Sequence, residues 1–424
     1  MKFSRQTLSN GLRFICAPQS SAQSVALAIG VGAGQRHEEK RTNGLAHFAE
    51  HMFFKGTEKR PHAQEISLPI DEVGGVLNAG TGIEMTYYYT LLPQAHWKLG
   101  WDLLADILLH SLFKEEEIER EKGVIAEEIN MYYDTPMVYV QEIFQNLMYG
   151  DHPLGWDSFG TKEIIGALDR QDFLDFYQKW YQPENLVVVA AGNLVEEELR
   201  REVEGSFGDR PTLPVGKPLL ISGVETGPKL KVLFKESDQA HAVLGVPAYS
   251  VNHPHHYAAE VLAAILGGGM SSRLFVQIRE RRGLAYYVRA GYDAYQDTGS
   301  LAISAGLNVK KIDEAVTVML AELGQVAQNL VGEPELRKAK EYLKGHLVLG
   351  CEGSRGTMEF LLEEELLEDG AKDLPEVLAK IDAVTAEQVL AVARDLFTAA
   401  NLHLAVIGPY QDKETASLQQ ILHL

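Results

Sequence analysis

The chain has 424 residues, of which 46% are hydrophobic and 23% charged, and 59 acidic against 39 basic residues give a formal net charge of −20. This length suits two or three globular domains, and the composition excludes collagen-like, disordered and low-complexity classes. The negative charge repels nucleic acid and anionic membrane surfaces, so we expect neither as a partner, whereas it favours cationic peptides.

Cysteine content and apolar runs predict a cytoplasmic protein. Cys16 and Cys351 are too few for a disulfide framework, which favours a reducing compartment. The first residues contain no apolar run of signal-peptide length. The longest apolar stretches, such as 186–192, have the length of a strand and not of a membrane span.

The first half of the chain mixes strands and helices. Aromatic and β-branched residues predict strands at 24–31 and 85–92. Apolar spacing predicts helices at 45–55, 97–112, 115–133 and 138–147. Pro69 is expected to break or kink a further helical segment at 62–73. Hairpin-like turns at Gly11, Gly82 and Gly291 favour an α+β fold over a doubly wound sheet.

An internal repeat divides the chain nearly in half. The apolar segment 185–192 matches 401–408 at an offset of 216 residues, and the apolar positions of the preceding helices align at the same offset. Between the halves, residues 208–228 contain four prolines and four glycines, which predicts a linker. We therefore expect two duplicated domains, 1–207 and 229–424, each a mostly antiparallel sheet with helices packed on one face.

The strongest chemical signal is the motif His47-Phe-Ala-Glu50-His51. On a helix, residues four apart lie on one face, so both imidazoles can bind one metal ion. Glu50 projects to the same side and can take a proton from metal-bound water, as in the inverted form of the common zinc-protease motif. The alternative is a metal-free polar helix face.

A catalytic zinc site needs a third protein ligand, which we expect on another helix. Segment 115–133 is dense in carboxylates, so helical periodicity alone does not select one. Glu121 and Glu128 are seven residues apart and share a face, which makes one a candidate ligand and the other a supporting residue.

At this point the chain resembles the insulinase/pitrilysin family of zinc metallopeptidases, which includes bacterial processing-peptidase-like proteins and the β subunit of the mitochondrial processing peptidase. The resemblance covers nearly the whole chain. It depends on segments TLSNGLR (7–13), GLAHFAEHMFFKGT (44–57), GGVLNAGTGIEMTYYY (74–89), REKGVIAEEI (120–129), LGGGMSSRLF (266–275) and IRERRGLAYYV (278–288).

The resemblance implies a role for each matching residue. Glu128 becomes the third ligand of one Zn²⁺ per chain, beside His47 and His51, and Glu121 becomes the supporting carboxylate. Asn78 and Ala79 match an edge strand to which the family's peptides add as a further strand. Arg279 and Tyr286 match a pair that contacts substrate near the scissile bond, although from the residues alone Arg279 is a surface charge and Tyr286 a core residue.

The function implied is a zinc-dependent endopeptidase that cleaves peptides or unfolded segments, with Glu50 as general base. Family members enclose substrate in a chamber of four such domains, so a chain with two implies a homodimer. Two alternatives stay open: a catalytic subunit that needs a distinct partner, and a non-catalytic structural subunit like the core subunits of a respiratory complex.

Overall fold

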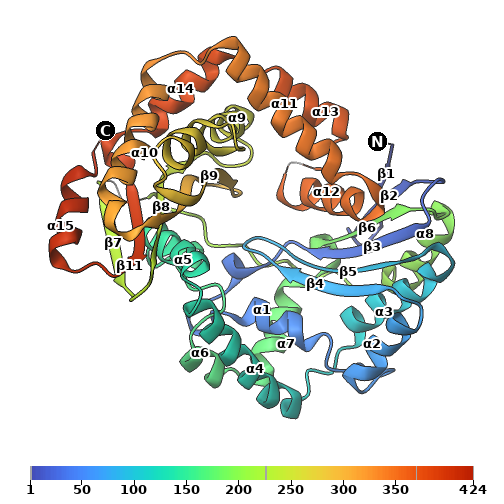
Figure 1. Cartoon of the computed structure of the whole chain (residues 1–424). Coiled ribbons are helices and arrows are strands. Elements are labelled where there is room, and N and C mark those ends of the chain that lie inside the picture. Colours follow the sequence, from blue (N-terminus) through green and yellow to red (C-terminus); the bar gives the residue numbers. More distant parts are fainter. Residues whose placement is uncertain (1, 225–226, 369, 424) are drawn as a thin grey trace. The chain divides into compact units, whose positions relative to one another are not determined.

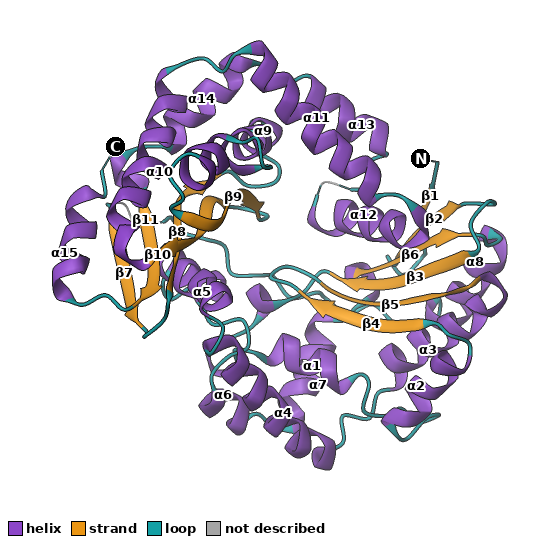
Figure 2. Ribbon diagram, viewed as in Figure 1, coloured by secondary structure: helices purple, strands orange, loops and turns teal. Residues whose placement is uncertain are grey.

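Helices and two separate β-sheets make up the chain in the computed structural model, which describes residues 2–224, 227–368 and 370–423 (Figure 2). The predicted α+β class is confirmed. The chain forms two compact units. The first contains Met1–Asn130, Asp157–Leu219 and Val348–Pro375, and the second contains Met131–Trp156, Leu220–Leu347 and Glu376–Leu424. The boundaries of these compact units differ from those of the sequence repeat, because each half of the chain contributes one segment to the other unit.

The sheet of the first unit has the strand order β1-β2-β6-β3-β5-β4 (Figure 1). Its neighbours are antiparallel except for the parallel pair β2 and β6. The strands are β1 (Ser4–Thr7), β2 (Arg13–Pro18), β3 (Ser24–Val31), β4 (Val76–Thr81), β5 (Thr86–Pro93) and β6 (Leu186–Gly192). This order leaves β4 at one edge, so its outer backbone groups are available to pair with another strand.

Helices of the first unit follow the predicted segments closely. They are α1 (Leu45–Met52), α2 (Ala63–Glu72), α3 (Trp97–His110), α4 (Glu115–Tyr133, whose last turn enters the second unit), α6 (Lys162–Ala167), α7 (Arg170–Trp180), α8 (Glu196–Phe207) and α12 (Gly353–Leu367). Pro69 lies inside α2 without ending it. Strand 24–31 has the predicted bounds, and the strand predicted at 85–92 starts and ends one residue later.

The sheet of the second unit has the order β7-β11-β8-β10-β9. Its strands are β7 (Lys229–Phe234), β8 (Gln239–Ala248), β9 (Ala285–Ala294), β10 (Gly299–Asn308) and β11 (His403–Gly408). Its helices are α5 (Pro136–Tyr149), α9 (His256–Gly267), α10 (Ile312–Gln328), α11 (Glu333–Gly350), α13 (Leu374–Asp382), α14 (Ala386–Leu396) and α15 (Asp412–Ile421), and a π-helical segment, η6, covers Phe275–Glu280. The ends of α11 and α13 pass into the first unit.

The predicted repeat corresponds to equivalent strands. In the first sheet β6 lies between parallel β2 and antiparallel β3, and in the second β11 lies between parallel β7 and antiparallel β8. The preceding helices α7 and α14 both begin with a capping box. The turn predicted at Gly291 is wrong, because this residue pairs with Ala302 inside the β9–β10 ladder.

Both faces of the first sheet are covered. Core residues on one face, such as Leu27, pack with Phe48 of α1 and Phe173 of α7. On the opposite face, Ala28 and its neighbours pack with Leu362 of α12, which comes from the second half of the chain. The expected layer of helices on one face is therefore supplemented by a helix on the other.

The two halves exchange helices reciprocally. In the first unit, Glu365 of α12 accepts hydrogen bonds from Arg5, and the Ser354 and Ser24 hydroxyls lie 2.7 Å apart. In the second unit, α5 from the first half packs against the sheet, and Gln141 donates to Ser304 of β10. Each sheet therefore has one face that is covered by a helix from the other half of the chain.

No helix among the residues that the structure describes is long and apolar enough to cross a membrane.

The exchange predicts that a substitution in α12 destabilises the unit that contains the N-terminal sheet. Leu362 is 1% exposed, and its replacement by Ala removes buried methyl groups at a cost of about 2–5 kcal/mol. We expect the denaturant midpoint followed by tryptophan fluorescence to fall, since Trp97, Trp101 and Trp180 are buried in this unit. Exposed Glu363 is the matched position, and Glu363→Ala should leave the midpoint nearly unchanged. Equal midpoints for the two variants would contradict a structural role of α12.

Candidate metal centre

Helix α1 begins at a tightly packed, buried end. Gly44 precedes it with φ of 90°, and a Cβ there would lie 2.5 Å from the carbonyl oxygen of Phe159, so only glycine fits. Glu38 caps the helix from outside it: its carboxylate accepts the backbone N–H groups of Gly44 and Ala46 at 2.8 and 2.7 Å. These bonds satisfy N–H groups that the helix itself leaves without acceptors.

The apolar side of α1 faces the protein core. Leu45, Phe48, Ala49 and Met52 are all at most 2% exposed. Because these positions occupy one side of the helix, the remaining polar residues point away from the apolar core.

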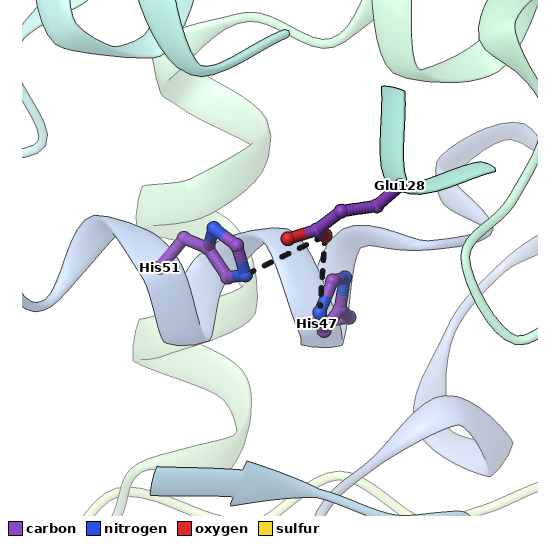
Figure 3. Close-up of side chains that lie close together, drawn as sticks. All are labelled: His47, His51 and Glu128. Carbon is purple, nitrogen blue, oxygen red and sulfur yellow. Dashed lines mark ion pairs between the residues drawn. The ribbon is translucent and has the colours of Figure 1, made fainter. Parts of the chain in front are cut away.

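Three side chains converge beyond this polar side, as Figure 3 shows. Glu128 reaches from α4, and its Oε2 lies 3.8 Å from Nε2 of His47 and 3.8 Å from Nε2 of His51. One donor atom from each residue lies within 4.8 Å of the others. The two imidazole rings are 4.7 Å apart, as expected for residues one helical turn apart. Sequence separation had left the choice between Glu121 and Glu128 open, and the structure brings Glu128 into the group.

The donor set fits a metal ion. Glu128 Oε2 is buried and makes no hydrogen bond with any described residue, although two imidazole nitrogens face it. Burial, and the neighbouring His51, lower the pKa of His47 to about 3, so this ring is neutral at pH 7. Where an imidazole nitrogen presents its lone pair to a carboxylate oxygen, the two repel each other unless a cation lies between them. Two imidazoles and one carboxylate are ligands that Zn²⁺ accepts.

Glu121 supports this group from a position two turns before Glu128 on α4. Its Oε1 lies 2.9 Å from Nδ1 of His51, and its Oε2 lies 2.6 Å from the Lys55 ammonium. Burial alone would raise the pKa of Glu121, but the hydrogen bonds from His51 and Lys55 outweigh it and lower the pKa. For His51, burial lowers the pKa, and the Glu121 hydrogen bond and nearby carboxylates raise it overall. The ionised carboxylate fixes the ring with Nε2 directed at Glu128.

Glu50 contacts the edge strand. Its Oε2 accepts a hydrogen bond of 2.5 Å from the Thr81 hydroxyl, at the end of β4. Burial raises the pKa of the Glu50 carboxyl, and the Thr81 hydrogen bond opposes this rise. A raised pKa gives this carboxylate a higher proton affinity than an exposed one, which favours a role in proton transfer.

Asn78 and Ala79 lie on the same edge strand, three and two residues before Thr81. Asn78 is exposed, and its side-chain oxygen accepts the Ala79 backbone N–H at 2.9 Å. In the sheet these two residues pair with Tyr89 and Tyr88 of β5. Their strand therefore has one paired side and one side open to an added strand.

Arg279 and Tyr286 lie in the second unit. Arg279 is exposed near the end of η6, and its guanidinium lies 5.0 Å from the Phe275 ring. Tyr286 is 72% exposed on β9, the edge strand of its sheet, so the interpretation of this residue as core is wrong. Their predicted contact with substrate stays a prediction. π-Helical segments are rare and occur frequently at functional sites.

Three residues of the site were missed by sequence reasoning. Glu38 and Thr81 form hydrogen bonds with residues of α1, and Lys55 forms an ion pair with Glu121. None has a periodic or spacing signal, because each acts through a contact made only in the folded chain.

Comparison with known proteins identifies the family. Residues 13–162 match the family model described as insulinase (peptidase family M16), and residues 167–343 match its companion, the peptidase M16 inactive domain. The chain is 36% identical over 405 residues to an uncharacterized zinc protease of Bacillus subtilis, covering 96% of this chain and 98% of that protein. A similarly named protein of Streptomyces coelicolor is 36% identical over 420 residues, covering 98% and 91%. The chain belongs to the insulinase family of peptidases.

Solved structures share the fold over nearly the full length. A protease from Helicobacter pylori superposes with a TM-score of 0.89 at 22% identity, covering 96% of this chain and 99% of that one. A chain of complex III from Candida albicans gives 0.84 at 19% identity, covering 99% and 100%. The fold is therefore shared by a protease and by a chain of complex III. The relatives named zinc proteases support a peptidase role.

Glu121→Gln should weaken metal binding without removing a candidate ligand. The amide loses the charge that attracts His51 and Lys55, so the ring is held less firmly, and supporting residues of this kind contribute about 10- to 100-fold to metal affinity. Competition with a chromogenic chelator measures the change in Zn²⁺ affinity. Glu117 is on the same helix and pairs with Arg120 at the surface, and Glu117→Gln is the matched control with unchanged affinity. An unaltered affinity in Glu121→Gln would remove this residue from the site.

Glu38 should make the stability of the chain depend on pH. Burial raises its pKa to about 7 from an ordinary value of 4.5, although three N–H donors oppose the rise. Because this pKa is higher in the folded state than in the unfolded one, the protonated carboxyl stabilises the fold, and this contribution is complete below about pH 4.5. It is lost as the pH rises through about 7, which lowers the free energy of unfolding by about 3 kcal/mol in all. Urea unfolding of wild type and Glu38→Gln between pH 5 and pH 8 tests this. The wild-type curve should fall more steeply with pH, and parallel curves would refute the assignment.

Proposed function

We propose that this chain is a zinc-dependent endopeptidase. The observation that carries the proposal is the convergence of His47, His51 and the buried Glu128 Oε2, which makes no hydrogen bond with a described residue. Beside this group lies the Glu50 carboxyl, whose pKa is raised. Membership of a peptidase family and relatives named zinc proteases support it. One Zn²⁺ per chain would be held by His47, His51 and Glu128.

Each residue of the site has a separate role in the proposed reaction. Bound zinc would polarise the scissile carbonyl and acidify the attacking water. Glu50 accepts the proton of that water and later donates it to the leaving amine, as a general base followed by a general acid. Glu121 keeps His51 oriented, and Arg279 with Tyr286 hold the substrate carbonyl and the negative charge that develops on it.

The substrate is a peptide or an unfolded segment that pairs with β4. Its backbone adds to the open edge at Asn78 and Ala79, which gives affinity with little dependence on sequence. The excess of negative charge favours cationic peptides. Because the chain supplies two of the four domains of the family's chamber, a homodimer in the cytoplasm completes the enzyme.

A non-catalytic role is the second candidate. Residues 167–343 match a model described as an inactive domain, and nearly the whole chain shares its fold with a chain of complex III. This alternative, and that of a catalytic subunit lacking its partner, make different predictions for metal content and cleavage.

Glu50→Gln should retain zinc and lose peptide cleavage. The amide cannot accept a proton, so we expect kcat to fall by at least 10²-fold, the lower range for loss of a general base, while the three ligand residues stay intact. A mixed library of unstructured peptides, analysed by mass spectrometry beside metal analysis of both proteins, measures this.

Three other outcomes have defined meanings. Zinc in both proteins with cleavage by neither indicates a missing partner subunit. Absence of zinc from both supports the structural role. Cleavage that persists in Glu50→Gln refutes this residue as the base. Removal of zinc by a chelator serves as the control for metal dependence.

A further inference from the structure

The end of the β4–β5 hairpin is fixed to the preceding loop. Backbone N–H groups of Gln35 and Arg36 donate to the carbonyl oxygens of Gly82 and Ile83, at 3.1 and 2.9 Å. A Cβ on Gly34 would lie 2.2 Å from the Gly82 oxygen, so this approach requires glycine. The hairpin end is therefore packed backbone against backbone.

A buried arginine strengthens this attachment. Arg36 is 1% exposed, and its Nη1 lies 2.6 Å from Oε1 of Glu84, which is itself 5% exposed in the turn of the hairpin. Its Nη2 donates to the carbonyl oxygen of Leu219, at 3.1 Å. Removal of one partner from a buried ion pair is strongly destabilising, so this contact holds the turn in one position.

Thr81 is the last residue of β4 before this fixed turn. It pairs with Thr86 of β5, whose hydroxyl donates to the Ala33 carbonyl at 2.8 Å. The Thr81 hydroxyl donates instead to Oε2 of Glu50, at 2.5 Å. Oε1 of Glu50 has no hydrogen-bond partner among the described residues, so one carboxylate oxygen is held while the other is available.

We propose that Thr81 is a positioning residue that fixes Glu50 relative to the substrate-binding edge strand, so that the strand which binds the peptide also orients the base. This inference rests on the proposed peptidase function. The hydrogen bond from the Thr81 hydroxyl occupies Oε2 of Glu50, which leaves Oε1 to receive the proton of the attacking water. Because Thr81 follows Ala79 by two residues on one strand, a peptide paired with that strand lies at a fixed distance from the base.

The kinetic test compares Thr81→Val with Thr81→Ser in the zinc-loaded, full-length chain. Valine keeps the shape and removes the donor, and a misplaced catalytic group loses up to about 10²-fold in rate. We expect Thr81→Val to lower kcat by about 10- to 100-fold with KM changed less than about twofold, because the pairing groups of β4 remain. Thr81→Ser restores the hydroxyl and should recover kcat to within about threefold of wild type.

Thr86→Val is the matched control, since it removes a threonine hydroxyl from the paired position of the same hairpin. It should lower the melting temperature and leave kcat unchanged. A normal kcat in Thr81→Val overturns the proposal. So does a loss that serine fails to rescue, or a loss shared equally by Thr86→Val, because each of these indicates a general effect on the hairpin.

A second measurement separates this inference from the proposed function. Urea unfolding of wild type, Thr81→Val, Glu50→Gln and the double variant forms a double-mutant cycle. A hydrogen bond to a charged group predicts effects on the unfolding equilibrium that are non-additive by about tenfold. If the zinc-loaded wild type cleaves no peptide, the proposed function fails, and the cycle alone decides whether Thr81 holds Glu50. Additive effects would show that it does not.

Discussion

The capping of helix α1 by Glu38 is the contact on which the candidate metal centre depends. The helix starts inside the protein, where water cannot satisfy its first N–H groups, and a carboxylate supplies the missing acceptors. With its start fixed and its apolar side buried in the core, the helix has one permitted rotation. That rotation directs His47 and His51 toward Glu128 of α4.

The duplicated units use one framework for different purposes. In the first unit α1 follows β3, buries one side and leaves three polar residues for chemistry. In the second unit α9 follows β8 in the same order, and ten of its twelve residues are buried. The helix at this position of the second unit is therefore mainly a packing element. Its exposed functional candidates, Arg279 and Tyr286, lie instead on η6 and on the edge strand β9.

Sequence reasoning succeeded where a residue's role follows from its spacing along the chain. Helical spacing identified the face of α1 with His47 and His51, and the repeat identified β6 and β11 as equivalent strands. Periodicity could not choose between Glu121 and Glu128, because both share one face and only the distance to α1 separates a ligand from its support. The exchange of α5 and α12 was also missed, since an amphipathic pattern shows that a helix has a partner surface but not which sheet provides it.

The exchange of helices has a consequence for how the chain is made. The first sheet has all its strands once β6 ends at Gly192, but α12 begins only at Gly353. At roughly 5–20 residues per second, the ribosome needs about 8 to 30 seconds to synthesise the intervening segment. During that interval the apolar face of the first sheet that packs with α12 has no α12 to cover it. Exposed apolar surface of this kind promotes aggregation, and even the N-terminal unit is complete only after translation has reached the last fifth of the chain.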